Sequence, residues 1–304
     1  MALCTLKLTR PLRPDEVVRN TVKLHFVKDR YAAYTELSGS FEYTGDLSDV
    51  TGIKLTAGGR NLHYGPLEYY RCEQTAGRVT VSFRSRGWSS ALTMNEPVPG
   101  MNYNLDLAGL AAANPSMPHV TYESNTSAVN YIYVKEHSTL WEAVSAYAMK
   151  AYGTQPYIYG HNQVCVRIPQ GSQYSIAPGD AAAFGTVRDR RAMLSKVYMA
   201  DIDDQYTYSV TNSQASGTEL VREHYYELDR QWLASPATGL QQRIDRSNRH
   251  SFDKFIRRIG FAGEDLFDVV SATVNGVTVS GRVCGIELTA EKKQIETVLY
   301  LGTE

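Results

Sequence analysis

Histidine is the residue type here with the clearest catalytic potential, because its side chain exchanges a proton near neutral pH. The chain has 304 residues, and its seven histidines are scattered, with no closely spaced metal-binding pair. His224 lies between Glu223 and Tyr225, where it could act as a lone general base. No local motif supplies a nucleophile and an orienting group for such a base. We therefore interpret His224 as a strand residue on a solvated face.

Carboxylates offer a second kind of chemistry. Asp201, Asp203 and Asp204 form an acidic cluster, but the glycine and closing glutamate of a calcium loop are missing. No local motif places two carboxylates across a cleft for glycoside hydrolysis, and no Gly-Xaa-Ser-Xaa-Gly elbow is present. We predict a solvated turn at the acidic cluster. The sequence therefore predicts no enzyme, with no catalytic, cofactor-binding or metal-binding residue.

The four cysteines, Cys4, Cys72, Cys165 and Cys284, are too widely spaced for a zinc knuckle or a redox dithiol. This spacing favours free thiols in a protein folded in a cytoplasm, although two disulfides remain an alternative. The N-terminal residues lack the apolar run of a signal peptide, and no stretch approaches 18 apolar residues. We expect neither a cleaved leader nor a membrane span.

A basic stretch is the most distinctive charged feature. Residues 240–259 are predicted to form one amphipathic helix, with Arg243, Arg246 and Arg249 on the face away from the core. Three interpretations remain open: a nucleic-acid site, a solvated helix face, or a contact with an acidic partner subunit. The net charge of −1 and the missing aromatic stacking motif count against nucleic acid. We predict that the three arginines lie at a subunit interface.

Most of the chain has the pattern of short strands. In residues 78–84, Val79, Val81 and Phe83 alternate with polar residues, and glycine-containing turns separate the runs between 22 and 92. Residues 105–169 differ, because a helix is predicted from a capping box at Thr139 and Glu142, followed by a hairpin at 156–168. Strands return afterwards, together with the helix at 240–259. The pattern predicts a mainly β fold with an α+β insert.

Three segments, taken in order, resemble the baseplate hub family of contractile phages, prophages and phage-tail-like bacteriocins. They are the strand and turn of residues 78–92, the capped helix with Trp141 and its hairpin within residues 135–158, and the final strand at 297–301. The resemblance implies two barrel-like tube domains flanking a small α+β domain. The implied division is an N-terminal arm at 1–20, a first barrel-like domain at 21–104, the α+β domain at 105–172, and a second barrel-like domain with one long helix at 173–304.

The resemblance also implies a function. In such hubs, three subunits form a ring that joins the six-fold tail tube to a trimeric central spike in a phage tail or tail-like injection particle. The implied partners are further copies of the chain, the tube protein, the spike protein and other baseplate proteins, with no membrane, cofactor or sequence-specific nucleic acid. Assembly is expected in the bacterial cytoplasm, before incorporation into a virion or extracellular particle. The alternatives are a tail-associated cell-wall hydrolase, a carbohydrate-binding module, or a neck or connector protein.

Overall fold

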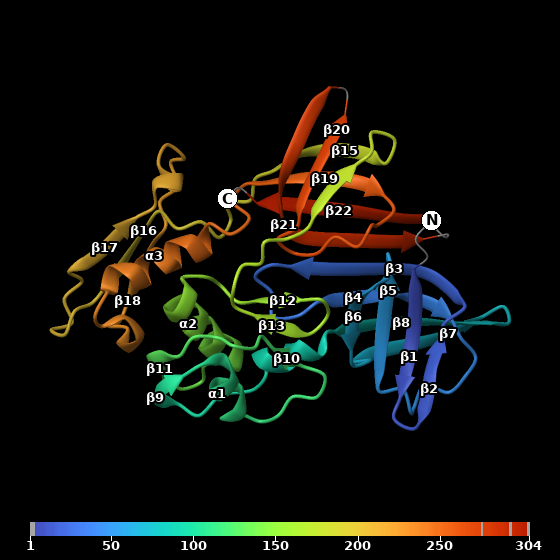
Figure 1. The fold of residues 1–304 in the computed structure, drawn as a ribbon, viewed down its shortest axis with the longest axis horizontal. Helices are drawn as coiled ribbons and strands as arrows, with labels where there is room; N and C mark the ends of the chain where they lie inside the picture. Colours follow the sequence, from blue (N-terminus) through green and yellow to red (C-terminus); the bar gives the residue numbers. More distant parts are fainter. Residues whose placement is uncertain (1–3, 275, 292–293, 303–304) are drawn as a thin grey trace. The chain divides into compact units, whose positions relative to one another are not determined.

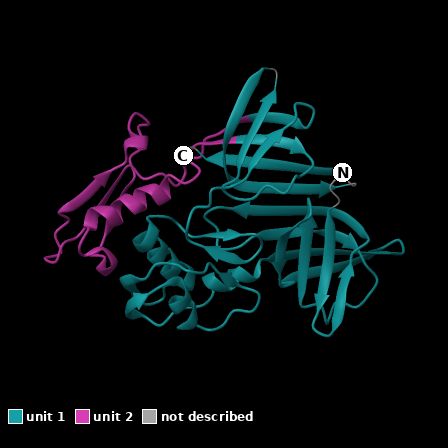
Figure 2. Ribbon diagram, in the orientation of Figure 1, with its two compact units in different colours: residues 1–184, 255–302, 304 teal, residues 185–254, 303 magenta. Residues whose placement is uncertain are grey.

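The computed structural model describes residues 4–274, 276–291 and 294–302. The chain divides into two compact units, residues 1–184 with 255–302 and 304, and residues 185–254 with 303 (Figure 2). The fold is mostly β, with 46% of residues in strands and 15% in helices, which confirms the predicted mainly β class. The sheets of the described residues are open, and none of them closes into a barrel. The predicted four-part division stays a prediction.

A ten-stranded sheet forms the body of unit 1 (Figure 1). Its main path runs in the order β15-β19-β22-β21-β3-β4-β8-β7, while β20 pairs with β21 and β14 pairs with β20. Strands from the two ends of the sequence meet at the antiparallel pair of β3 and β21, where Phe26 is opposite Leu288. The strands are β3 (Asn20–Asp29), β4 (Glu36–Glu42), β7 (Tyr69–Thr75), β8 (Arg78–Arg86), β14 (Gln173–Ile176), β15 (Ala181–Val187), β19 (Asp253–Ile259), β20 (Val269–Val274), β21 (Val277–Glu291) and β22 (Gln294–Gly302).

A four-stranded sheet packs against this body and shares its core. Its order is β2-β1-β5-β6, with β1 (Thr5–Arg10), β2 (Arg13–Val17), β5 (Gly52–Ala57) and β6 (Arg60–Gly65). The segment predicted as an N-terminal arm, residues 1–20, thus supplies two strands of a sheet. Alternating buried side chains explain this, since Leu6 and Leu8 are fully buried in the same cluster as Phe26 and Phe83. At Gly65 the two sheets come so close that a Cβ would lie 2.0 Å from the carbonyl oxygen of Arg86.

The α+β part of unit 1 has its own core. Helix α2 (Leu140–Tyr152) packs on β11 (Val129–Val134), which pairs with β9 (Gly100–Leu105). The predicted capping box is confirmed, because the Glu142 amide donates to the Thr139 hydroxyl and the Glu142 carboxylate accepts from the Thr139 amide. The remaining elements are η1 (Trp88–Thr93), α1 (Leu107–Ala112), β10 (Thr121–Tyr122) and the predicted hairpin of β12 (Tyr157–Tyr159) and β13 (Gln163–Cys165). None of the helices in the described ranges is both long and apolar enough to cross a membrane.

Unit 2 is a three-stranded sheet with one helix on a single face. The sheet order is β17-β16-β18, and Leu240 and Ile244 of the helix pack on Val197 and Met199 of the central strand. The elements are β16 (Lys196–Met199), β17 (Tyr208–Thr211), η2 (Ser213–Ala215), β18 (Glu223–Tyr226), η3 (Arg230–Trp232) and α3 (Pro236–Ser247).

The prediction of one helix over residues 240–259 is wrong. Helix α3 ends at Ser247, and the backbone of His250 has a left-handed φ of 58° before β19 begins at Asp253. Residues 247–251 read Ser-Asn-Arg-His-Ser, and Ser and Asn compete with helical backbone hydrogen bonds through their own side chains. Phe255, Ile256 and Ile259 fitted a helical period, although they belong to β19.

A buried ion pair joins three parts of unit 1. Lys28 of β3 is 3% exposed, and its ammonium contacts the carboxylate of Asp265 and donates to the carbonyl oxygen of Gly160 at 2.8 Å. Asp265 also accepts from the backbone amides of Gly160 at 3.1 Å and Leu266 at 2.8 Å. The central sheet, the β12–β13 turn and the loop before β20 are therefore held by one polar cluster.

A second polar contact lies between the two packed sheets. The His63 ring of β6 is within 2.9 Å of the Thr35 hydroxyl through Nδ1 and within 2.8 Å of the Ser85 hydroxyl through Nε2. His63 is fully buried, and this burial lowers its pKa to about 3, with a further contribution from nearby His161. The imidazole is therefore neutral at ordinary pH.

Replacing Lys28 by Met should cost about 3–5 kcal/mol of unfolding free energy, because Asp265 is left as a buried charge without its cation. Urea denaturation measures this loss. The control is Lys23→Met on the same strand, where the side chain is exposed and the change should stay within about 0.5 kcal/mol. Equal effects of the two substitutions would contradict the structural role of the buried pair.

His63 should make unit 1 less stable in acid. Its pKa is lower in the folded protein than the unfolded value of about 6.5, so the unfolded chain binds the proton more readily. The His63 contribution is fully present above pH ~6.5 and is lost as the pH falls toward 3, by up to about 1.4 kcal/mol per pH unit. His63→Gln keeps a donor and an acceptor and should flatten this part of the stability profile. Parallel profiles for both proteins would refute the assignment.

Candidate partner-binding surfaces

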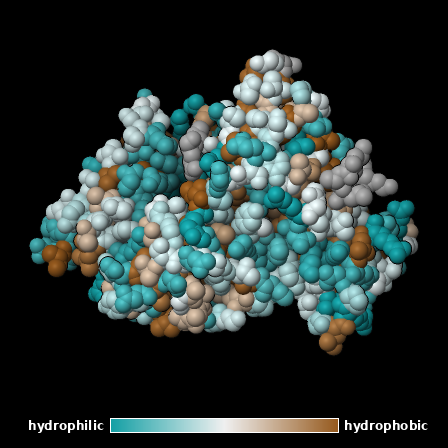
Figure 3. All heavy atoms as spheres, in the orientation of Figure 1, coloured by the Kyte–Doolittle hydropathy of each residue, from teal (hydrophilic) through white to brown (hydrophobic). Residues whose placement is uncertain are grey.

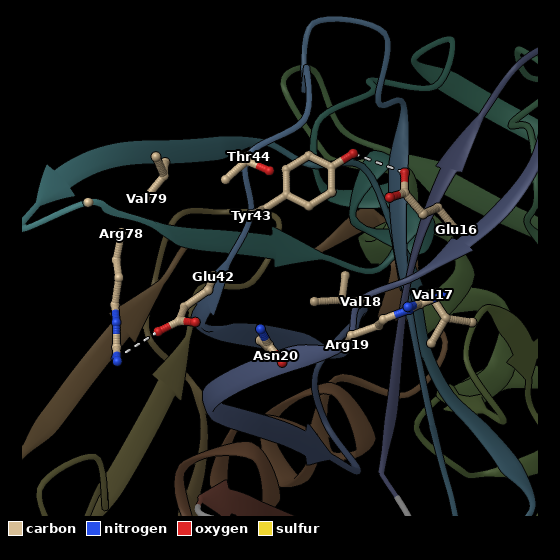
Figure 4. A pocket seen from close by; sticks show the side chains of 11 residues that line it. Glu16, Val17, Val18, Arg19, Asn20, Glu42, Tyr43, Thr44, Arg78 and Val79 are labelled. Atoms are coloured by element: carbon tan, nitrogen blue, oxygen red, sulfur yellow. Dashed lines mark hydrogen bonds and ion pairs between the residues drawn. The ribbon is translucent and has the colours of Figure 1, made fainter.

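A pocket of about 520 Å³ opens in unit 1 where three chain segments meet. The segments are the β2–β3 connection, the end of β4 and the β7–β8 turn, and Figure 4 shows their side chains around the opening. The lining consists of Glu16, Val17, Val18, Arg19, Asn20, Glu42, Tyr43, Thr44, Gly77, Arg78 and Val79. This lining mixes both charges with small apolar groups, so it suits a polar chain segment better than an apolar ligand.

One side of the pocket is held by a nearly buried arginine. The Arg10 side chain is 6% exposed, and its guanidinium contacts Glu16 at 2.6 Å and Asp49 at 2.7 Å. It also donates to the Tyr43 hydroxyl at 3.0 Å. That hydroxyl in turn donates to Glu16 at 2.9 Å (Figure 4). These contacts fix the β1–β2 hairpin against the loop that follows β4.

Both acidic residues of the pocket are engaged by neighbours. Glu16 accepts from Arg10 and Tyr43, and Glu42 forms an ion pair with Arg78 at 3.3 Å across the rim. The described lining residues include no histidine, cysteine or serine that one of these carboxylates could activate. The pocket therefore offers charged rim groups, already held in place by their neighbours, to a binding partner.

Arg243 does not point outward as predicted. Its guanidinium donates to Asp229 at 2.8 Å and to the carbonyl oxygen of Gly239 at 3.1 Å, and it lies 4.3 Å from the Tyr226 ring centroid. The Asp229 side chain is only 7% exposed, so this is a largely desolvated ion pair. Arg243 therefore fastens α3 to the segment after β18.

The other two predicted arginines occupy different positions. Arg246 is exposed in the last turn of α3, where a cation also interacts favourably with the helix dipole. Arg249 is half-buried and follows the end of the helix. The three arginines therefore do not form one outward row, and only Arg246 has the exposed helical position that was expected. Sequence reasoning missed the Asp229 partner, because the residues are 14 positions apart and no periodicity relates them.

The other candidate residues take structural positions. His224 is exposed, and its Nδ1 lies 3.4 Å from the Tyr226 hydroxyl. The Asp201 carboxylate accepts from the amides of Asp203 and Gln205, which confirms the predicted turn at the acidic cluster. No disulfide joins the four cysteines, all of which lie within the described residues, and Cys72 is exposed on β7. Burial raises the pKa of Cys4 to about 11 and of Cys165 to about 12, so these thiols are poor nucleophiles.

The two helix arginines should differ sharply in their effect on stability. Arg243→Glu places a second negative charge beside the desolvated Asp229 and should destabilise unit 2 by about 3 kcal/mol or more. Arg246→Glu alters an exposed position and should change the unfolding free energy by about 0.5 kcal/mol or less. Urea denaturation followed by circular dichroism compares the two. An Arg243→Glu protein as stable as the wild type would show that the Asp229 contact contributes nothing.

Comparison with known proteins identifies the fold. The sequence matches no family model and no curated protein. The structure is similar to a tail protein from Neisseria meningitidis MC58, with a TM-score of 0.73 and 13% identity over 100% of this chain and 97% of that one. It is also similar to the 43 kDa tail protein of prophage MuSo2 from Shewanella oneidensis, with a TM-score of 0.70 and 14% identity over 99% and 98%.

A secretion-system protein has the same fold. This E. coli component of the type VI secretion system is described as similar in structure to the bacteriophage T4 tail proteins gp27 and gp5. It aligns with a TM-score of 0.55 and 9% identity over 98% of this chain and 77% of that one. The resemblance seen in the sequence is thus confirmed at the level of the fold, and this chain has the fold of phage tail proteins.

Proposed function

We propose that the chain is a structural baseplate hub protein, three copies of which join a six-fold tail tube to a trimeric central spike. The observation that carries this proposal is the likeness to tail proteins over the whole length of both chains. Many β proteins would resemble a tail protein over a single sheet. The alignment here extends over both units and the α+β part, which makes it more specific. The particle would be a phage tail or a tail-like injection device.

Symmetry explains why such a subunit would contain two β-rich parts around an α+β insert. The parts of the ten-stranded sheet before residue 87 and after residue 252 meet at the β3–β21 pair. If each part forms one barrel-like tube domain, three subunits present six similar faces to the tube and keep three-fold symmetry toward the spike. The proposed division is residues 1–20, 21–104, 105–172 and 173–304.

Exposed strand edges support association with other subunits. Strand β7 lies at one end of the ten-stranded path, all seven of its residues are exposed, and Tyr69 and Tyr70 are among them. Strand β2 is likewise exposed at the edge of the four-stranded sheet. Unpaired edges of this kind bind other chains unless they are covered, and tyrosine is enriched at protein interfaces. The proposed partners are further copies of the chain, the tube and spike proteins, and other baseplate proteins.

The proposed role is non-enzymatic. Arg243 and Arg246 of α3, together with Arg249 just after the helix, remain the proposed contribution of this region to a subunit interface. Because Arg243 has an internal partner, Arg246 would carry most of that contact. Assembly would take place in the bacterial cytoplasm before the protein enters a virion or an extracellular particle. A zymogram against peptidoglycan tests the alternative of a wall hydrolase, and a clearing band lost on mutation of Glu16 or Glu42 would favour it.

Oligomerisation gives the direct solution test. Light scattering of the purified chain, alone and mixed with its tube and spike proteins, should show a stable homotrimer in at least one condition. The physical reason is the area of exposed edge and aromatic surface that a lone subunit leaves uncovered. A stable monomer in every condition would contradict the hub proposal.

A further inference from the structure

Unit 2 has two unlike surfaces at opposite ends of its three-stranded sheet. One is the loop of residues 201–207 between β16 and β17, called here the knob loop. The other is a small cleft lined by Arg188, Arg190, Met193, Gln214, Ser251 and Phe252, called here the arginine cleft. All of these residues belong to unit 2. The two surfaces differ in shape and in charge.

The knob loop presents one apolar side chain between carboxylates. Ile202 is 86% exposed, and Asp203 and Asp204 beside it are also exposed. No ion-pair partner of either carboxylate is found among the described residues. Figure 3 shows a mostly hydrophilic face with small, separate hydrophobic patches, one of them at the left extremity of unit 2. The tip therefore combines one exposed apolar side chain with two exposed carboxylates in a single turn.

The knob loop is held in a defined conformation. Asp201 accepts from the amides of Asp203 at 2.9 Å and Gln205 at 3.0 Å, and its second oxygen accepts from the Thr207 hydroxyl at 2.9 Å. Tyr206 packs edge-on against Tyr225 with ring centroids 5.1 Å apart. Tyr225 in turn stacks on Tyr198 at 4.6 Å. A preformed loop loses little conformational entropy when it binds, which favours recognition.

The arginine cleft has the complementary character. Its volume is about 270 Å³, below the usual range for small-molecule sites and suited to one or two side chains. Met193 is 2% exposed and Phe252 lies 5.2 Å beneath the Arg188 guanidinium, so the floor is apolar. Arg188 and Arg190 are exposed, and neither has an ion-pair partner among the residues that the structure describes. The cleft thus offers apolar contact and two available cations.

The knob loop and the arginine cleft lie at opposite ends of strand β16. The knob loop follows the last residue of β16, whereas residues 188–193 precede its first residue. Gln214 follows the end of the antiparallel β17, on the cleft side. The end of α3 is there too, because Ser247 accepts from the Leu194 amide at 3.1 Å and Asn212 donates to Asn248 at 2.7 Å. A knob loop therefore cannot reach the cleft of its own unit.

We propose that the knob loop of one copy docks into the arginine cleft of a second copy. Ile202 would enter the apolar floor between Met193 and Phe252, and Asp203 and Asp204 would face Arg188 and Arg190. Because two different surfaces meet, the contact runs head to tail and closes into a ring when the rotation between copies permits. This inference rests on the proposed function and assigns a subunit contact of the trimer to unit 2.

Charge reversal on the full-length chain tests the contact. The knob variant combines Asp203→Lys with Asp204→Asn, since the left-handed φ of 58° at position 204 tolerates Asn. The cleft variant combines Arg188→Glu with Arg190→Glu, and a third protein carries all four changes. Asp201 stays, because it organises the loop. Light scattering is used in the condition where the wild type forms a trimer.

Each two-residue variant should weaken association by at least about tenfold, with unchanged circular dichroism, because it juxtaposes like charges. The four-residue variant should recover much of the association, since the lysine introduced at position 203 then faces the introduced glutamates. Recovery separates a direct contact from misfolding. Trimers of wild-type strength in both two-residue variants would overturn the knob contact and leave the hub proposal intact. A wild type that stays monomeric in every condition would overturn both.

Disulfide trapping tests the geometry independently. In a Cys72→Ser background, oxidation of a protein with Ile202→Cys and Gln214→Cys should give covalent trimers, because each copy is linked to the next. Neither cysteine substitution alone should cross-link in a head-to-tail contact. Covalent dimers formed by Ile202→Cys alone would show a two-fold contact between knob loops and would contradict the proposal.

Discussion

The buried ion pair between Lys28 and Asp265 holds together parts of unit 1 that lie far apart in the sequence. Lys28 belongs to the central strand β3, Asp265 to the loop before β20, and the shared Gly160 to the α+β part. A buried charge without its partner is costly, so moving any one of these parts away would leave a desolvated charge without compensation. The β3–β21 ladder runs through the same region and extends over seven residue pairs. Early and late strands of the sequence therefore belong to the same sheet.

Because these contacts lie inside unit 1, partner proteins must bind at other surfaces. The sheet interior is buried, and within it His63 and Lys28 have polar partners from other parts of unit 1. Exposed side chains that could bind a partner lie along the β7 edge, in the pocket beside Arg10 and at the two ends of the unit 2 sheet. Charged side chains occur at each of these places, beside polar, aromatic or apolar neighbours. Such surfaces suit binding to other proteins, which agrees with the structural role proposed above.

Local signals in the sequence predicted local structure well. The capping box at Thr139 and Glu142, the alternation of Val81 and Phe83, and the turn at Asp201 were all confirmed because neighbouring residues determine them. The prediction of a helix over 240–259 was wrong because it gave more weight to the apparent helical period of the apolar residues than to the polar residues at 247–251. The Arg243–Asp229 and Lys28–Asp265 pairs, and the assembly of the arginine cleft, depend on tertiary proximity. No periodicity in the sequence signals such contacts.

Electron cryo-microscopy of the assembled particle tests the central claim most directly. The chain would be co-expressed with its tube and spike proteins, and the map would be calculated with no symmetry higher than three-fold. The account predicts three copies in one ring between the last six-fold tube layer and the spike, with the ten-stranded sheets arranged around the axis. A map with this chain absent from the tube–spike junction, or present there as a single copy, would contradict it.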